Sequence, residues 1–142
     1  MKTLRALLAV AVLGVGLAGC GGGDARAEVE QAFKGYQTAL LARDFPTACG
    51  YNAPESTQKL IASVATQGIQ ASTCEEALAE IYAESGAAEF ADTIGRTYAI
   101  QDVQVDGDEA TITWTATVDG SPDSATIGMR RIDGGWKLAT AG

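Results

Sequence analysis

The side chains able to do chemistry are few, and the most informative feature is that none of the 142 residues is histidine. Without an imidazole the chain cannot run Ser-His-Asp or Cys-His catalysis, hold a histidine-ligated zinc ion or shuttle protons through histidine. Three cysteines remain, Cys20, Cys49 and Cys74, and none has a base partner. We therefore predict no catalytic residue, no metal site and no cofactor.

The first twenty residues have the layout of an export signal. A basic start is followed by an uncharged apolar run over residues 6–17, which is shorter than the roughly 20 residues that a membrane-spanning helix needs. The run ends in Leu17-Ala18-Gly19-Cys20, which resembles the lipobox of bacterial lipoproteins. The alternative is an ordinary secretory signal whose cleavage site happens to contain cysteine.

The lipobox resemblance implies that residues 1–19 are removed as a signal peptide and that the Cys20 thiol receives a diacylglyceryl group. Two acyl chains hold a protein stably, whereas one does so only marginally. Residues 20–27 are expected to form a tether, because Gly21-Gly22-Gly23 imposes few backbone constraints. The expectation is a domain over residues 28–142, lipid-anchored on the extracytoplasmic face of the cell membrane.

Cys49 and Cys74 are left as a pair when Cys20 carries the lipid. An even number of cysteines in an exported chain predicts a disulfide between them. Closing a loop of about 25 residues would be worth about 3 kcal/mol in the chain-entropy model. The alternative is two buried free thiols.

Composition limits the class of protein further. A hydrophobic share of 46% is high enough for a packed core, and the length suits one domain. The formal net charge of −8 argues against a nucleic-acid partner, because binding phosphates needs a basic surface. The acidic run over residues 106–109 lacks the spacing of a calcium loop and is typical of a turn.

Apolar residues fall at helical spacing in the first part of the chain. Val29, Phe33, Tyr36 and Leu40 predict a helix over 28–41, with Glu30, Lys34 and Gln37 elsewhere on its surface. Further helices are predicted over 47–49, from Pro54, after a capping box at Thr73 and Glu76, and over 87–94 with Phe90 facing inward.

From Thr97 the hydrophobic period changes to two. A change of phase near Gln101 and Asp102 predicts a bulge or bend, and Asp106-Gly107-Asp108 predicts a hairpin turn. The clearest strand runs over 110–118, where apolar residues alternate with threonines. Two more strands are predicted, around 125–129 and 136–138. Helices followed by an antiparallel meander of about four strands predict an α+β fold.

Five segments in this order resemble small NTF2-like lipoproteins of the cystatin-like superfamily, which are common in actinobacteria. The segments are Ala39–Phe45, Ala48-Cys49, Thr73–Leu78, Val103–Ala110 and Asp133–Leu138. The resemblance implies a cone in which a curved sheet wraps over helices around a pocket. The short hairpin often found before the third segment is missing, which argues against a deep pocket.

Two classes of function are open. The first, which we favour because of the anchor, the tether, the expected cone and the lack of a catalytic constellation, is a non-enzymatic module that binds an envelope protein or an apolar small molecule. The second is an enzyme of the ketosteroid-isomerase or dehydratase type, which needs a carboxylate base and hydrogen-bond donors facing an oxyanion. Tyr36, Tyr98 and Asp102 are the residues that would have to converge, and core packing is the other interpretation of both tyrosines.

The two tryptophans allow a functional and a structural interpretation. Trp114 and Trp136 occupy apolar strand positions, where they either stack on a ligand or, as we favour, pack in the core. NTF2-like domains often pair through the sheet, so a homodimer is a further expected assembly.

Overall fold

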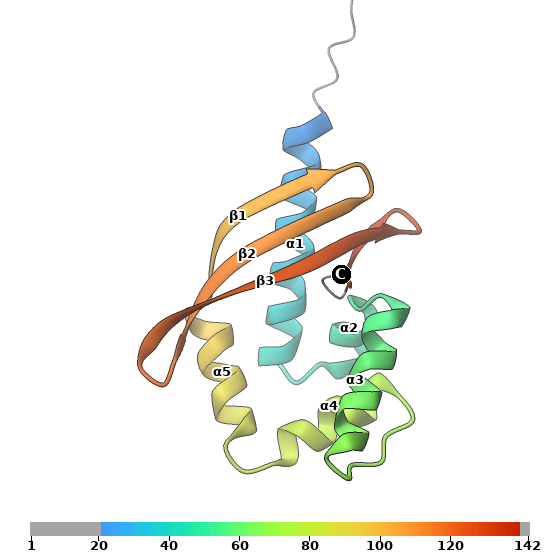
Figure 1. Cartoon of the computed structure of the whole chain (residues 1–142), viewed down its shortest axis with the longest axis vertical. Helices are drawn as coiled ribbons and strands as arrows, with labels where there is room; N and C mark the ends of the chain where they lie inside the picture. Colours follow the sequence, from blue (N-terminus) through green and yellow to red (C-terminus); the bar gives the residue numbers. More distant parts are fainter. Residues whose placement is uncertain (1–20, 140–142) are drawn as a thin grey trace, which may run out of the picture.

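The computed structural model describes residues 21–139. Cys20, the signal segment and residues 140–142 lie outside this range. The described elements are α1 (Gly21–Leu41), α2 (Phe45–Gly50), α3 (Pro54–Thr66), α4 (Cys74–Ala83), α5 (Ala87–Thr97), β1 (Ala99–Asp106), β2 (Glu109–Val118), β3 (Ser121–Ile132) and β4 (Gly135–Ala139) (Figure 1). The predicted α+β class is confirmed.

The four strands form one antiparallel sheet in the order β1-β2-β3-β4. On β2 the residues Ala110, Ile112 and Ala116 are buried, as their alternation with threonine predicts. The β2–β3 turn places Asp119 and Gly120 at positive φ, which matches the two-residue turns that follow strand twist. The predicted irregularity in β1 is confirmed, since the register shifts between Ile100 and Asp102.

Helices cover one face of the sheet. Figure 1 shows α1 passing behind the strands while α2 to α5 gather at the other end of the molecule. Helix α1 contacts β1 and β4, and α5 contacts β2. The largest fully buried side chains come from α1, α3 and the sheet: Phe33, Ile112, Met129, Val29, Val64 and Val103. Each such burial contributes about 1.5–3 kcal/mol relative to exposure.

A second, smaller core joins α1, α2 and α4. It consists of Ala39, Ala48, Cys74 and Leu78. The predicted Cys49–Cys74 disulfide is formed in this cluster, with 5.9 Å between the two Cα atoms, and it joins α2 to α4. The crosslink therefore stabilises the helical end of the molecule.

Arg43 ties the turn after α1 to two later helices. The backbone of Arg43 has a positive φ of 59°. Its Nη1 lies 2.8 Å from Asp92 Oδ1 on α5. Its guanidinium lies 4.4 Å from the centre of the Tyr82 ring on α4. The hydrogen bond from Arg43 holds the pKa of Asp92 below its ordinary value. This contact fixes α5 beside the end of α1.

Two local expectations are wrong. The tether expected over residues 20–27 is helical from Gly21 onward, because Asp24 lies in the first turn, where a negative charge is favourable, and Ala25 to Ala27 are good helix formers. Phe90, expected to face inward, is only half covered, with 50% of its surface exposed. A helical pattern of apolar residues marks a face, and the neighbouring elements decide how much of that face is covered.

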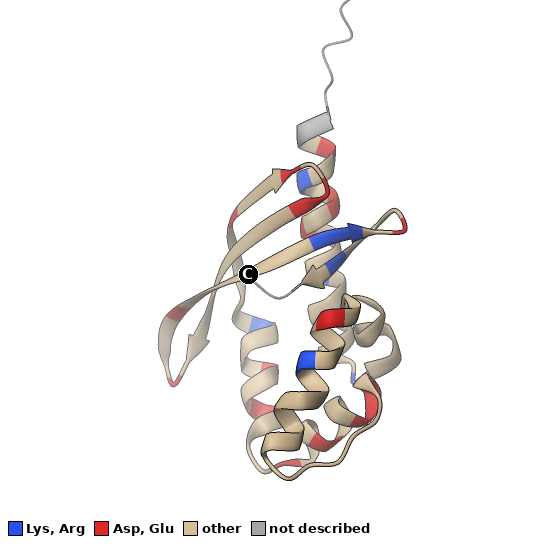
Figure 2. Ribbon diagram, turned by 45° about the vertical axis from the view of Figure 1, so that its right-hand side comes forward, with Lys and Arg blue, Asp and Glu red and all other residues tan. Residues whose placement is uncertain are grey.

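Charges are distributed unevenly. Acidic side chains are spread over helices and hairpins (Figure 2). Arg130 and Arg131 on β3 lie beside Lys137 on β4, because Arg130 and Lys137 are partners in the sheet. Two of these cations pair with helix carboxylates, Arg130 with Glu55 and Arg131 with Glu28. The basic cluster is thus partly neutralised by the helices beside it.

Candidate functional site

One face of α1 lines an apolar cavity. Phe33, Tyr36, Gln37 and Leu40 are spaced three or four residues apart and so share that face. The opposite walls come from α5 and the sheet: Phe90, Ala91, Ile94, Trp114, Ile127 and Leu138. We call this hollow, of about 290 Å³, the α1–α5 cavity.

The cavity suits a small apolar molecule. Its volume is near the lower end of the range for small-molecule pockets, roughly 300–1,000 Å³. Half-exposed Phe90 belongs to its wall, so the ring covers the hollow on one side and meets solvent on the other. A mostly apolar lining with a few polar groups is the usual composition of a ligand site.

Gln37 is one of three side chains with polar atoms in this lining, beside Tyr36 and Trp114. The residue is only 6% exposed, but its amide is not among the fully buried polar groups that lack a partner: within residues 21–139 that description fits Arg131 Nε alone. The Gln37 amide offers both a donor and an acceptor to a molecule in the cavity.

Tyr36 supplies the second polar group. Burial, with a smaller contribution from nearby Tyr82, raises the pKa of Tyr36 to about 12. The phenol therefore keeps its proton at neutral pH and can donate a hydrogen bond. Tyr36 and Gln37 thus add hydrogen-bonding groups to the apolar lining.

The residues predicted to converge are divided between two hollows. Tyr36 and Trp114 line the α1–α5 cavity, whereas Tyr98 and Asp102 line another hollow of about 370 Å³ between α1 and β1. Phe33 stands between them, with its ring centre 5.6 Å from that of Tyr98 and 5.8 Å from that of Trp114. The arrangement of Tyr36 with Asp102 that an isomerase requires is not formed.

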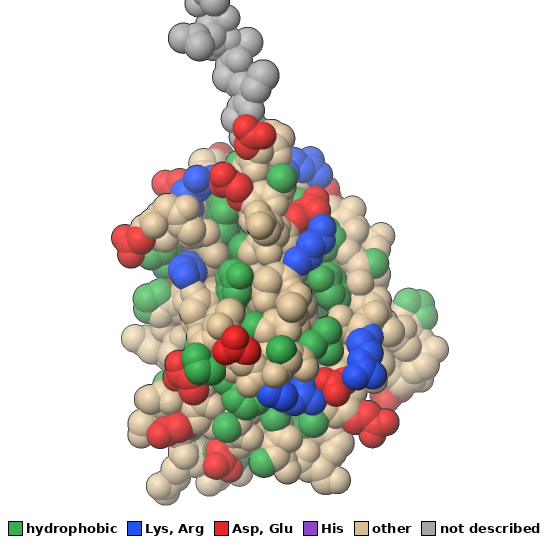
Figure 3. Space-filling model, turned by 180° about the vertical axis from the view of Figure 1, so that it is seen from behind, with side chains coloured by type: hydrophobic (Ala, Val, Ile, Leu, Met, Phe, Trp, Pro, Cys, Tyr) green, Lys and Arg blue, Asp and Glu red, His purple; other side chains and the backbone are tan. Residues whose placement is uncertain are grey.

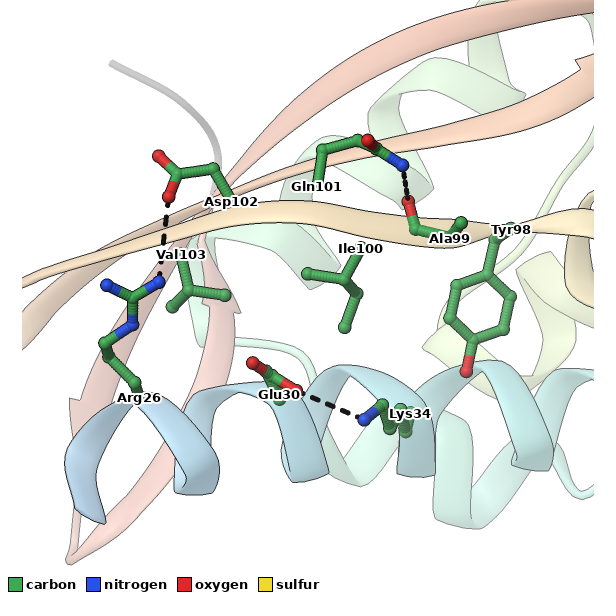
Figure 4. Close-up of a pocket in the computed structure, with 9 residues that line it drawn as sticks. All are labelled: Arg26, Glu30, Lys34, Tyr98, Ala99, Ile100, Gln101, Asp102 and Val103. Atoms are coloured by element: carbon green, nitrogen blue, oxygen red, sulfur yellow. Dashed lines mark hydrogen bonds and ion pairs between the residues drawn. The ribbon is translucent and has the colours of Figure 1, made fainter. Parts of the chain in front are cut away.

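The second hollow is lined largely by charged and polar groups (Figure 4). Asp102 pairs with Arg26 at 3.7 Å, and Glu30 pairs with Lys34 at 3.2 Å. About half of each side chain of the Arg26–Asp102 pair is exposed. These opposite charges compensate one another in water, so Asp102 does not have the dry environment that raises the basicity of a catalytic carboxylate.

Trp136 does not belong to any hollow described here. Its side chain is 4% exposed in the main core, its Nε1 donates to Glu28 Oε2 at 3.3 Å, and Arg131 lies over its ring at 4.8 Å. The favoured interpretation of Trp136 as a core residue is therefore confirmed. Trp114, by contrast, is partly buried and reaches the α1–α5 cavity.

Gln37 and Arg26 were missed by sequence reasoning. Gln37 was assigned to the outer surface of its helix because it is polar, although it lies four residues from Phe33 and three from Leu40. That spacing was a usable signal. Arg26 fell within the expected tether, so its place beside β1 had no signal in the sequence.

The surface opposite to that of Figure 1 shows hydrophobic side chains interrupted by charged ones (Figure 3). Within residues 21–139, no group of three acidic or cysteine side chains is arranged to hold a metal ion. None of the helices described is both long and apolar enough to span a bilayer.

Comparisons with known proteins give one likeness to report. No protein-family model matches the chain, and no curated protein matches it. The structure is similar to the crystal structure of a Campylobacter jejuni protein provisionally named an NTF2-like transpeptidase. The two share 16% sequence identity and a TM-score of 0.47 over 77% of this chain and 94% of the other.

Proposed function

We propose that this chain is an extracytoplasmic, lipid-anchored binding module that holds a small apolar molecule in the α1–α5 cavity without transforming it. The observation that carries the binding role is the α1–α5 cavity itself, an apolar hollow of about 290 Å³ with Tyr36 and Gln37 in its lining. The Gln37 amide can both donate a hydrogen bond to a ligand and accept one from it.

The ligand class follows from the lining. Phe33, Ile94 and Trp114 present rings and aliphatic carbon, which favour an aromatic or aliphatic body. Tyr36 and Gln37 supply hydrogen-bonding groups in the same lining, which suit an oxygen-bearing group on that body. The expected ligand is therefore an apolar molecule with one hydroxyl or carbonyl.

Naphthol and naphthalene test this idea because they differ only by a hydroxyl. The full chain in mild detergent is titrated with each compound, and tryptophan fluorescence reports binding beside Trp114. We expect naphthol to bind more tightly, and Gln37→Leu to weaken naphthol about tenfold, the value of one hydrogen bond. Naphthalene binding should be unchanged by that substitution.

A matched variant separates the hydrogen bond from cavity shape. Tyr36→Phe keeps the ring and removes only the hydroxyl, so it should weaken naphthol and spare naphthalene. If the native chain binds neither compound, or if Gln37→Leu leaves the preference for naphthol intact, the proposed ligand class is wrong.

The lipid anchor rests on the Leu17-Ala18-Gly19-Cys20 motif. Helix α1 starts at the next residue, so an anchored Cys20 would join the membrane to the domain through a helix. Intact-mass measurement of the chain from its native host should show cleavage before Cys20 and added acyl groups. An unprocessed leader, or a Cys20→Ser variant that is processed and retained at the membrane equally well, would contradict the anchor.

A further inference from the structure

The two edge strands of the sheet, β4 and β1, differ in their backbone hydrogen bonding to the rest of the molecule. At the β4 edge, the segment after α2 adds backbone hydrogen bonds: Leu138 N donates to Tyr51 O at 2.7 Å, and Ala53 N donates to Leu138 O at 2.8 Å. At the β1 edge, no backbone group elsewhere in residues 21–139 pairs with the outer side of the strand. The β1 edge is therefore free to accept another strand.

A groove runs along this free edge. The hollow of about 370 Å³ and a second one of about 630 Å³ share Arg26, Asp102 and Val103. Together they extend along β1 from Tyr98 to Gly107, with α1 as the opposite wall. We call this feature the β1 groove.

The strand contributes its backbone edge to the groove. The residues from Tyr98 to Val103 line the first hollow without interruption. Because successive side chains of a strand point to opposite faces, an unbroken run cannot line a hollow by side chains of one face alone. A neighbour in the groove therefore meets backbone N–H and C=O groups.

Helix α1 contributes a line of alternating charges. Arg26, Glu30 and Lys34 are four residues apart, so they lie about 6 Å apart along one side of the helix. Side chains on one face of an extended strand recur about every 6.6 Å. The line of charges on α1 thus has nearly the period of a strand lying beside β1 (Figure 4).

We propose that the β1 groove binds an extended segment of a partner protein, which adds to β1 as a fifth strand. Its side chains facing α1 would be acidic, basic and acidic at alternate positions, opposite Arg26, Glu30 and Lys34. Strand addition draws affinity from main-chain hydrogen bonds and specificity from alternate side chains.

Two features of β1 fit a selective rather than a general site. The register shift between Ile100 and Asp102 leaves the run from Asp102 to Asp106 as the regular part, and bulges on edge strands discourage unselective pairing. The Arg26–Asp102 pair crosses the groove at 3.7 Å and is half exposed. A pair of this kind is worth little, so an arriving segment can displace it.

Synthetic peptides test the groove independently of the α1–α5 cavity. Calorimetry with the full chain in mild detergent compares a nine-residue peptide carrying glutamate, lysine and glutamate at alternate central positions with its charge-reversed counterpart. We expect the first to bind about tenfold more tightly. The triple variant R26E/E30K/K34E should reverse that preference.

Controls separate backbone pairing from simple charge attraction. The first peptide with methylated central backbone nitrogens keeps its side chains but should lose most of its binding, because strand addition needs those N–H groups. The double variant E30K/K34E keeps an ion pair within α1 and reverses two of the three charges, so it should turn the preference toward the charge-reversed peptide by less than the triple variant does. Binding of neither peptide, an unreversed preference in the folded triple variant, or full binding by the methylated peptide would overturn the proposal.

Discussion

Helix α1 separates two hollows of opposite character. Its Phe33, Gln37 and Leu40 side lines the α1–α5 cavity, which is mostly apolar, whereas its Arg26, Glu30 and Lys34 side lines the β1 groove, where charges are paired and exposed. A polar group without a partner is costly in the first environment and nearly free in the second. Affinity in the α1–α5 cavity should therefore depend on the Gln37 amide. Affinity in the β1 groove should depend on backbone pairing.

The largest predicted effect comes from removing the wall between the two hollows. Phe33 is 1% exposed and touches both sides of that wall. Phe33→Ala should lower the free energy of unfolding by about 3–5 kcal/mol, measured by urea denaturation. Phe90→Ala is the control, because a half-exposed ring should cost well under half as much. Equal losses from the two variants would mean that Phe33 is not the central packing residue.

Loss of the disulfide should rank second and should affect neither hollow. Cys49→Ser with Cys74→Ser should cost about 3 kcal/mol, because the crosslink closes a separation of 25 residues between α2 and α4. Binding of naphthol and of the groove peptide should be retained at a temperature where the variant is folded. If the folded variant bound neither naphthol nor the peptide, the disulfide between α2 and α4 would be required for the shape of both hollows.

Filling the cavity should distinguish the two hollows by binding. Ala91 lines the α1–α5 cavity from α5, and Ala91→Leu adds carbon to that space while keeping a good helix former. Naphthol affinity should fall at least tenfold, about 1.4 kcal/mol, with peptide binding unchanged. The matched control is Ala79→Leu on the exposed surface of α4, which should leave both affinities as they are. A cavity still accepting naphthol after Ala91→Leu would contradict the assigned site.

The smallest effect is a pH dependence at the end of α1. Because Arg43 lowers the pKa of Asp92, the Asp92–Arg43 contact stabilises the fold above the ordinary carboxyl pKa of about 3.9 and loses this effect as the pH falls through the lower, folded value. Thermal unfolding should show Asp92→Asn to be less stable than the native chain near neutrality, with the difference vanishing in acid. Glu84→Gln, beyond the end of α4 and away from this contact, is the matched control for loss of one carboxylate.

Much of the sheet could be predicted because its signals are local. Alternation of apolar residues with threonine identified β2, and the phase change near Gln101 identified the irregularity in β1. The Thr73 cap was also readable: Thr73 Oγ1 accepts from Glu76 N at 3.2 Å, although the Glu76 carboxylate accepts from Ser72 N rather than from the amide of Thr73 itself. Each of these features depends on residues close in sequence.

The hollows could not be predicted because they depend on how distant elements pack. Tyr36 and Asp102 were expected to converge, but Phe33 fills the space between their hollows. Gln37 is buried because α5 and the sheet close over its side of α1, and the exposure of Phe90 is set by the same packing. Side-chain type alone assigned both residues to the wrong environment.

The most direct test of the binding role is a nuclear Overhauser measurement on the full chain with naphthol. The account predicts contacts from the naphthol ring to the side chains of Trp114 and Ile94, and none to Ile100 in the β1 groove. Contacts confined to Ile100, or the absence of any contact to Trp114 and Ile94 at saturating naphthol, would show that the α1–α5 cavity is not the ligand site.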